Sequence, residues 1–71
     1  MKVRELKPLL YYKAKVDIYR SKTEDKEGIN VRRIAPDEIP EELLDLDIHF
    51  VSTTITADSD TAYATIEIFV N

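Results

Sequence analysis

The first hydrophobic residues of the chain recur at steps of three and four, which is the spacing of one helical face. This spacing predicts a short helix over residues 3–12. Pro8 has no backbone N–H and its ring clashes with the preceding turn, so we expect it to kink this helix or to delay its regular part. The apolar face of the predicted helix consists of Val3, Leu6, Leu9 and Leu10.

The hydrophobic period changes to two after residue 13, where Ala14, Val16 and Ile18 alternate with polar positions. Such alternation is typical of a half-buried strand. The next segment, residues 21–28, is polar and charged and ends on Gly28, the only glycine. We expect this glycine to take the positive φ that ends a hairpin loop. The pattern therefore predicts a strand followed by an exposed loop.

Two of the later predicted strands contain a change of phase. In the strand predicted over residues 29–34, Ile34 falls on the opposite face from the other aliphatic residues, which indicates a bulge or an early end. The strand predicted over residues 47–57 is rich in β-branched residues and changes phase between Phe50 and Val51. Either a bulge corrects this second slip, or both faces of the strand are covered.

The segment between these two strands, residues 35–46, is predicted to contain one or two helical turns. Pro36 and Pro40 exclude a longer helix, because a proline biases the residue before it away from helical geometry. Pro40 is well placed as the first helical residue, and the two glutamates after it suit the positive end of the helix dipole. The leucines of this segment are then able to reach the core.

The last strand, predicted over residues 61–70, alternates most regularly and follows a turn at residues 58–60. The chain is therefore predicted to be a single α+β domain, residues 1–71. Its four-stranded, mainly antiparallel sheet carries the N-terminal helix on one face, with the second helical turn before the third strand. A chain of this length buries only a small core, and without cysteine it has no disulfide to stabilise it.

Charge divides the chain into two halves. All ten Lys and Arg residues lie between Lys2 and Arg33, whereas nine of the fourteen acidic residues follow Arg33. One interpretation is that the two halves attract each other in the folded domain. The other is that the second half offers an acidic surface to a basic partner, and even mimics nucleic-acid phosphate in the groove of a host DNA-binding or defence protein. The residues of this candidate surface are Asp37, Glu38, Glu41, Glu42, Asp45 and Asp47.

Most catalytic signatures are missing from the sequence. One glycine is too few for a phosphate-binding loop, and thiol catalysis and Cys-based metal sites need cysteine. The single histidine, His49, alternates onto one face with Asp47 and Thr53, but the nucleophile elbow and oxyanion donors of a hydrolase are not recognisable. We interpret His49 as a solvated or edge-strand residue and expect no catalytic residue.

Two further binding chemistries are weighed and set aside. The pairs Asp45–Asp47 and Asp58–Asp60 have the spacing of hard-cation ligands, but the later positions of a calcium loop hold unsuitable residues, so no metal or cofactor is expected. Basic and aromatic residues of the first half have the composition of a small nucleic-acid binder. The net charge of −4 argues against that partner. These residues are Tyr11, Tyr12, Lys13, Lys15, Tyr19, Arg20, Arg32 and Arg33.

Three stretches of the sequence support a resemblance to known proteins. The opening KVRELKPLL running into VDIY, the later IPEELLDLDI and the closing hairpin resemble small uncharacterised proteins encoded by prophages and other mobile elements of Gram-positive bacteria. The likeness spans most of the chain through short motifs. It implies an accessory or host-interaction role and assigns no site residue.

Together these features predict a non-enzymatic interaction module that self-associates, most simply as a twofold dimer. No segment has the length of a membrane span and no signal peptide is recognisable, so a cytoplasmic location is expected. The last strand carries one charge and no proline, so it would be poorly protected if it formed a sheet edge. If it lies centrally, the domain is expected to stay monomeric. The candidate self-association residues on it are Tyr63, Thr65, Glu67 and Phe69.

Overall fold

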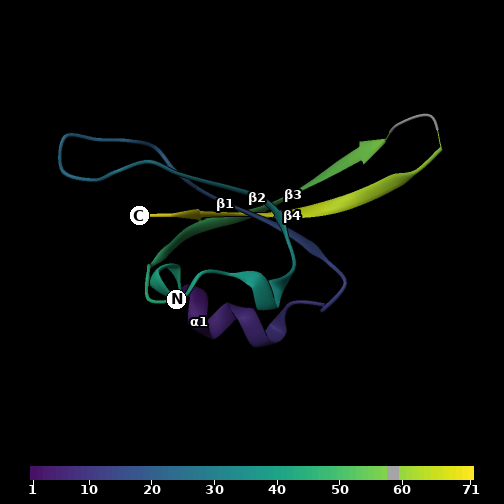
Figure 1. The fold of residues 1–71 in the computed structure, drawn as a ribbon, viewed down its shortest axis with the longest axis horizontal. Coiled ribbons are helices and arrows are strands. Elements are labelled where there is room, and N and C mark those ends of the chain that lie inside the picture. The colour runs from purple at the N-terminus through teal and green to yellow at the C-terminus, as the bar shows by residue number, and fades with distance from the viewer. Residues whose placement is uncertain (58–59) are drawn as a thin grey trace.

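The computed structural model describes residues 1–57 and 60–71, and its main element is a four-stranded sheet (Figure 1). The order across the sheet is β2-β1-β4-β3. The outer pairs β1–β2 and β3–β4 are antiparallel, and the central pair β1–β4 is parallel. The predicted α+β class is confirmed, with a sheet that is mixed. The strands are β1 (Lys15–Arg20), β2 (Ile29–Ile34), β3 (Ile48–Ala57) and β4 (Ala62–Val70).

The helical elements all lie on one side of the sheet, as Figure 1 shows. The helix predicted over residues 3–12 is shorter in the structure, where α1 continues directly into a 3-10 turn. The predicted helical turn before the third strand is present as 3-10 geometry on either side of Pro40. These elements are α1 (Val3–Leu6), η1 (Lys7–Leu9), η2 (Pro36–Glu38) and η3 (Glu41–Leu43).

The change to 3-10 geometry explains which residues of the predicted helix face are buried. Pro8 stands at the start of η1, where its missing N–H costs no hydrogen bond. A 3-10 turn advances by about 120° per residue, against about 100° in an α-helix, so the helical phase is lost after Leu6. Val3 is fully buried and Leu10 half-buried, as predicted. Leu9 is 73% exposed, so its assignment to the apolar face was wrong.

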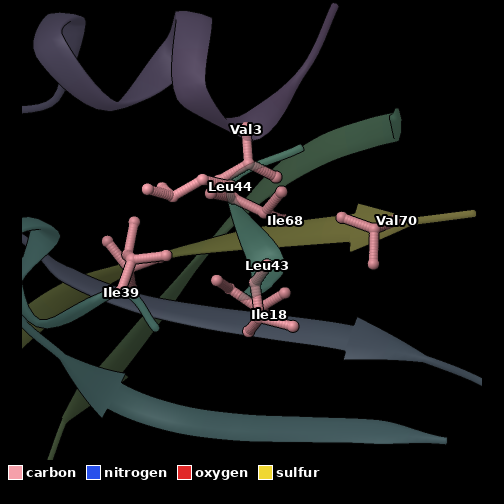
Figure 2. Close-up of a cluster of buried hydrophobic side chains, with 8 residues drawn as sticks. Val3, Ile18, Ile39, Leu43, Leu44, Ile68 and Val70 are labelled. Carbon is pink, nitrogen blue, oxygen red and sulfur yellow. The ribbon is translucent and has the colours of Figure 1, made fainter. Parts of the chain in front are cut away.

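The hydrophobic core fills the space between the sheet and the helical layer (Figure 2). Its central residues come from both halves of the chain, and burying each such aliphatic side chain stabilises the fold by about 1.5–3 kcal/mol. The buried residues are Val3, Val16, Ile18, Ile39, Leu43, Leu44, Ile68 and Val70.

The phase change predicted in the second strand is a bulge. Val16 pairs with Ile34 and Ile18 with Val31, so two residues of β2 lie opposite one residue of β1. Arg33, within the bulge, has φ 55°, in the left-handed region that few residues other than glycine adopt. No glycine has positive φ, so the prediction for Gly28 was wrong.

The phase change in the third strand is also a bulge. Ile48 pairs with Val70 and Phe50 with Phe69, which leaves His49 as the extra residue of β3. After the bulge the alternation of β3 is regular and pairs with β4 as far as Ala57 and Ala62. The turn predicted at residues 58–60 falls mainly outside the described ranges.

The β3–β4 hairpin extends beyond the rest of the sheet. β1 pairs with β4 only over residues 65–69, so residues 55–57 and 62–64 of the hairpin have no third strand beside them in the part of the chain that the structure describes. Figure 1 shows this ribbon projecting from the helical layer, and the domain measures 42 × 26 × 18 Å along its principal axes. The outer part of β3 therefore lies far from the core.

Candidate functional site

Half of the candidate acidic surface is neutralised by cations of the first half of the chain. Arg4 donates from Nε to Asp45 Oδ1 over 3.0 Å and from Nη2 to Glu41 Oε1 over 3.3 Å, and Lys2 Nζ lies 3.2 Å from Asp47 Oδ1. The Arg4 guanidinium lowers the pKa of the Asp45 carboxyl, and the two carboxylates raise the pKa of Arg4. These contacts agree with the interpretation that the oppositely charged halves attract each other in the folded domain.

The same segment is also joined to the N-terminus by the backbone. Val3 donates to the Leu46 carbonyl over 3.1 Å, Arg4 to that of Leu44 over 2.7 Å, and Ile48 to that of Met1 over 2.8 Å. The ion pairs therefore lie along a hydrogen-bonded seam between the first residues and residues 44–48. These ion pairs therefore help to hold the N-terminal residues against the segment before β3.

The other three candidate acidic residues are also not a free array. Glu38 Oε1 accepts the backbone N–H of Ala35 over 2.8 Å and so caps η2. Asp37 and Glu42 are exposed and make no ion pair within the described part of the chain. Only two of the six predicted carboxylates thus make no ion pair or cap in the described residues, and this arrangement does not favour a phosphate mimic.

The sheet face opposite the helical layer carries a row of aromatic rings. Tyr19 of β1, Phe69 of β4 and Phe50 of β3 are cross-strand neighbours, with ring centroids 5.4 Å and 4.4 Å apart. Phe50 and Phe69 stack with an interplanar angle of 15°. Phe69 therefore has a ring neighbour on each side, and Phe50 at the end of the row is 50% exposed.

A buried carboxylate lies beside this row. Asp17 is 6% exposed, and its oxygens accept the Tyr19 hydroxyl over 2.9 Å and the Arg33 backbone N–H over 2.7 Å. The hydrogen bond to Asp17 raises the pKa of the Tyr19 hydroxyl. Asp17 thereby holds the β2 bulge in place, since it is the acceptor for the Arg33 amide. Alternation predicted a solvated position for this residue, so its role was missed.

The four candidate self-association residues share the open face, but their strand is central. Thr65 is buried, Glu67 accepts the Thr54 hydroxyl, and Tyr63 lies 5.1 Å from the Arg33 guanidinium carbon. Residues 65–69 of β4 pair with β1 on one side and with β3 on the other. An edge contact through this part of β4 is therefore excluded, because its backbone groups are used inside the sheet, and a central β4 is the arrangement for which a monomer was expected.

β3 forms one edge of the sheet, a position that sequence reasoning did not single out. β3 is ten residues long, stands last in the sheet order and contains no Lys, Arg, Asp, Glu or Pro. Val51 is 45% exposed and Ile55 is 78% exposed, and both point to the side of the sheet that carries the helical layer. The composition of the strand was visible in the sequence, but its position at the edge was not.

A cavity of about 730 Å³ lies where the row of rings meets the loop after β1. His49 borders it, exposed, with its ring 5.3 Å from that of Phe50. Within the described residues no hydroxyl or carboxylate is hydrogen-bonded to this imidazole, and no group of three metal-ligating side chains is found. The cavity thus shows no assembled nucleophile–base pair. It is lined by Tyr19, Arg20, Lys26, His49, Phe50 and Phe69, among others.

Comparison with family models, with curated proteins and with solved structures finds no match to this chain. Over the described residues, none of the helices has the length and apolar character that crossing a bilayer requires. The function must therefore be inferred from the surfaces themselves.

Proposed function

We propose that this chain is a non-enzymatic protein-interaction module that associates with a second copy of itself through the edge of β3. One observation carries the proposal: a ten-residue edge strand without a charged side chain exposes Val51 and Ile55. Ile48 donates its N–H to the Met1 carbonyl, and beyond this residue the N–H and C=O groups of such an edge are a template for another strand. A second copy supplies that strand with the same polarity, length and apolar content.

The size of the domain supports the same proposal. A core of this size supplies only about 3–5 kcal/mol, and the chain has no cysteine with which to add a disulfide. Pairing two β3 edges removes Val51 and Ile55 from water at about 25 cal/mol per Å² of apolar area. Association thus adds stability that the isolated domain lacks.

The test is the molar mass of the protein by size exclusion with light scattering, from low to high micromolar concentration. The wild-type chain is expected to move towards the mass of two chains as concentration rises. Ile55→Lys is expected to stay at one chain, since the side chain is exposed in the isolated domain and its charge opposes pairing only in the dimer. Leu9→Lys is the matched control, because Leu9 is similarly exposed but lies in the helical layer.

Two results would overturn the proposal. One is a wild-type mass of a single chain across the whole concentration range. The other is equal loss of association in Ile55→Lys and Leu9→Lys, which would place the contact on some other surface. Circular dichroism of both variants distinguishes loss of association from loss of folding.

A further inference from the structure

We infer that the two β3 strands pair antiparallel with Thr53 opposite Thr53 of the second copy, so that two four-stranded sheets join into one of eight strands. This inference rests on the proposed function and specifies its register. It follows from three properties of β3: the parity of its faces, the limits of its regular part, and the positions of its exposed aliphatic side chains.

The faces of the strand restrict where a twofold axis can stand. Residues directly opposite each other in an antiparallel pair point to the same face of the sheet. The twofold axis must therefore lie midway between a residue and its own copy. It cannot place a residue opposite the copy of its chain neighbour, because neighbours such as Thr53 and Thr54 point to opposite faces. Each register is then defined by the one residue that lies opposite itself.

The regular part of β3 limits the choice further. The bulge at His49 interrupts the strand, which leaves Phe50 to Ala57 as the regular run. Centring the pair near the middle of this run uses the largest number of edge groups. Only Thr53 and Thr54 satisfy this condition.

The exposed aliphatic residues decide between these two registers. With Thr53 at the centre, Val51 lies opposite Ile55 of the second copy, and by symmetry the contact occurs twice. Both side chains are exposed in the single domain, at 45% and 78%, and a cross-strand pair of β-branched residues stabilises a sheet. With Thr54 at the centre, Ile55 faces Thr53 and Val51 faces Ala57. Only the Thr53 register therefore packs the exposed aliphatic side chains of one copy against those of the other.

Electrostatics allow this register as well. β3 carries no Lys, Arg, Asp or Glu, so no like charges face each other across the new pair. A twofold axis perpendicular to the sheet keeps both helical layers on one side. Both rows of rings then lie on the other side, and the joined sheet has one continuous open face.

The absence of cysteine allows a direct test by disulfide formation. Three single variants, Ser52→Cys, Thr53→Cys and Thr54→Cys, are oxidised mildly and examined on a non-reducing denaturing gel. Opposite residues in an antiparallel pair have Cα atoms about 4.5–5.5 Å apart, within the range of a disulfide. In the Thr53 register, position 52 and its own copy are offset by two residues, so their Cα atoms lie about 8 Å apart and do not bridge.

Thr53→Cys is therefore expected to convert almost completely to a covalent dimer, while Ser52→Cys and Thr54→Cys stay monomeric on the gel. A mixture of Ser52→Cys and Thr54→Cys is expected to form the cross-linked heterodimer, because these positions face each other in this register. Oxidation of all three variants in denaturant gives the background of random collisions.

The outcomes separate the register from the proposed function. A cross-link in Thr54→Cys alone would overturn the Thr53 register and leave the β3 edge as the contact. A wild-type dimer in which none of the three variants cross-links would overturn the Thr53 register, and loss of association in Ile55→Lys alone would then still assign the contact to β3. A wild-type chain that is monomeric by light scattering overturns the proposed function, whatever the gels show.

Discussion

The two edges of the sheet differ in how they are protected. β2 is six residues long, contains a bulge at Arg33, presents the exposed Arg32 and follows the charged loop of residues 21–28. β3 is ten residues long, has its bulge near one end at His49 and has no charged side chain. Charges, bulges and short length are the means by which edges avoid pairing. The comparison shows that the molecule protects one edge by all three, whereas Met1 covers only the first residue of the other.

The largest expected effect concerns the central strand beside β3. Ile68 of β4 is fully buried and lies between Ile18 of β1 and Val51 of β3. Ile68→Ala is expected to lower the free energy of unfolding by about 2–5 kcal/mol, measured by urea denaturation in the monomeric Ile55→Lys background. Ile66→Ala, at a half-buried position on the same face, should cost less. Equal losses would contradict the assignment of the core.

The next effect concerns the β2 edge. Asp17→Ala removes the acceptor of the Arg33 amide and of the Tyr19 hydroxyl, and is expected to cost about 1–3 kcal/mol. Hydrogen exchange of the Arg33 amide should accelerate, since the bulge loses its anchor. Tyr19→Phe, the control, removes one of the two hydrogen bonds and should cost less. Unchanged exchange at Arg33 would show that Asp17 does not hold the bulge.

The Asp17–Tyr19 hydrogen bond also predicts a dependence on alkaline pH. Because the pKa of Tyr19 is raised in the folded chain, its contribution to stability is present below the ordinary value of 10.0 and is lost as pH rises through the folded value. Tyrosinate absorbance should show a late phase for Tyr19, and Asp17→Ala should abolish that phase. A late phase that survives this substitution would assign it to another tyrosine.

A smaller effect is expected when the protection found on β2 is copied to β3. Ser52→Lys introduces two lysines whose Cα atoms lie about 8 Å apart across the proposed twofold axis, and two ammonium groups at about that separation repel each other by about 0.5 kcal/mol in a water-like dielectric. The dimer dissociation constant should rise about twofold at low salt, and the difference should shrink as salt is added. Ser52→Gln is the uncharged control. Equal effects of the two substitutions would exclude repulsion as the cause.

The smallest effect is expected in the acidic segment that precedes β3. The pKa of Asp45 is lowered by its hydrogen bond with Arg4, so its contribution to stability is present above the ordinary value of 3.8 and is lost as pH falls through the folded value. Asp45→Asn should therefore be slightly less stable than the wild type at pH 7 and equal to it at about pH 2. Its oligomeric mass should not change, and a change would connect the acidic segment to association.

The sequence predicted the strands and their irregularities well because both are local properties. The phase slips at Ile34 and before Val51 are recorded in the alternation of side chains, and each corresponds to a bulge. The error at Leu9 has an equally local cause, since Pro8 changes the helix type and hence the angular spacing of the residues after it.

The order of the strands in the sheet, by contrast, cannot be inferred from the alternation of side chains. Alternation shows that β4 has two faces but not that β1 pairs with it in parallel, and so it does not show that β3 forms the edge. The burial of Asp17 was missed for a related reason. Its acceptor role depends on the Arg33 amide, which only the pairing of β1 with β2 brings within reach. Candidate residues on β4 were therefore chosen for an edge position that β3 occupies.

The parallel pairing of β1 with β4 has a consequence for folding. Lys15 pairs with Thr65, so this contact closes a loop of most of the chain, whereas β1–β2 and β3–β4 join segments that are close in sequence. Non-local pairings form late and slow the folding of small domains. We therefore expect two hairpins to form first and their docking to limit the rate. Until they dock, the backbone groups of β4 that face β1 are unpaired, and this transient surface is where misassembly would begin.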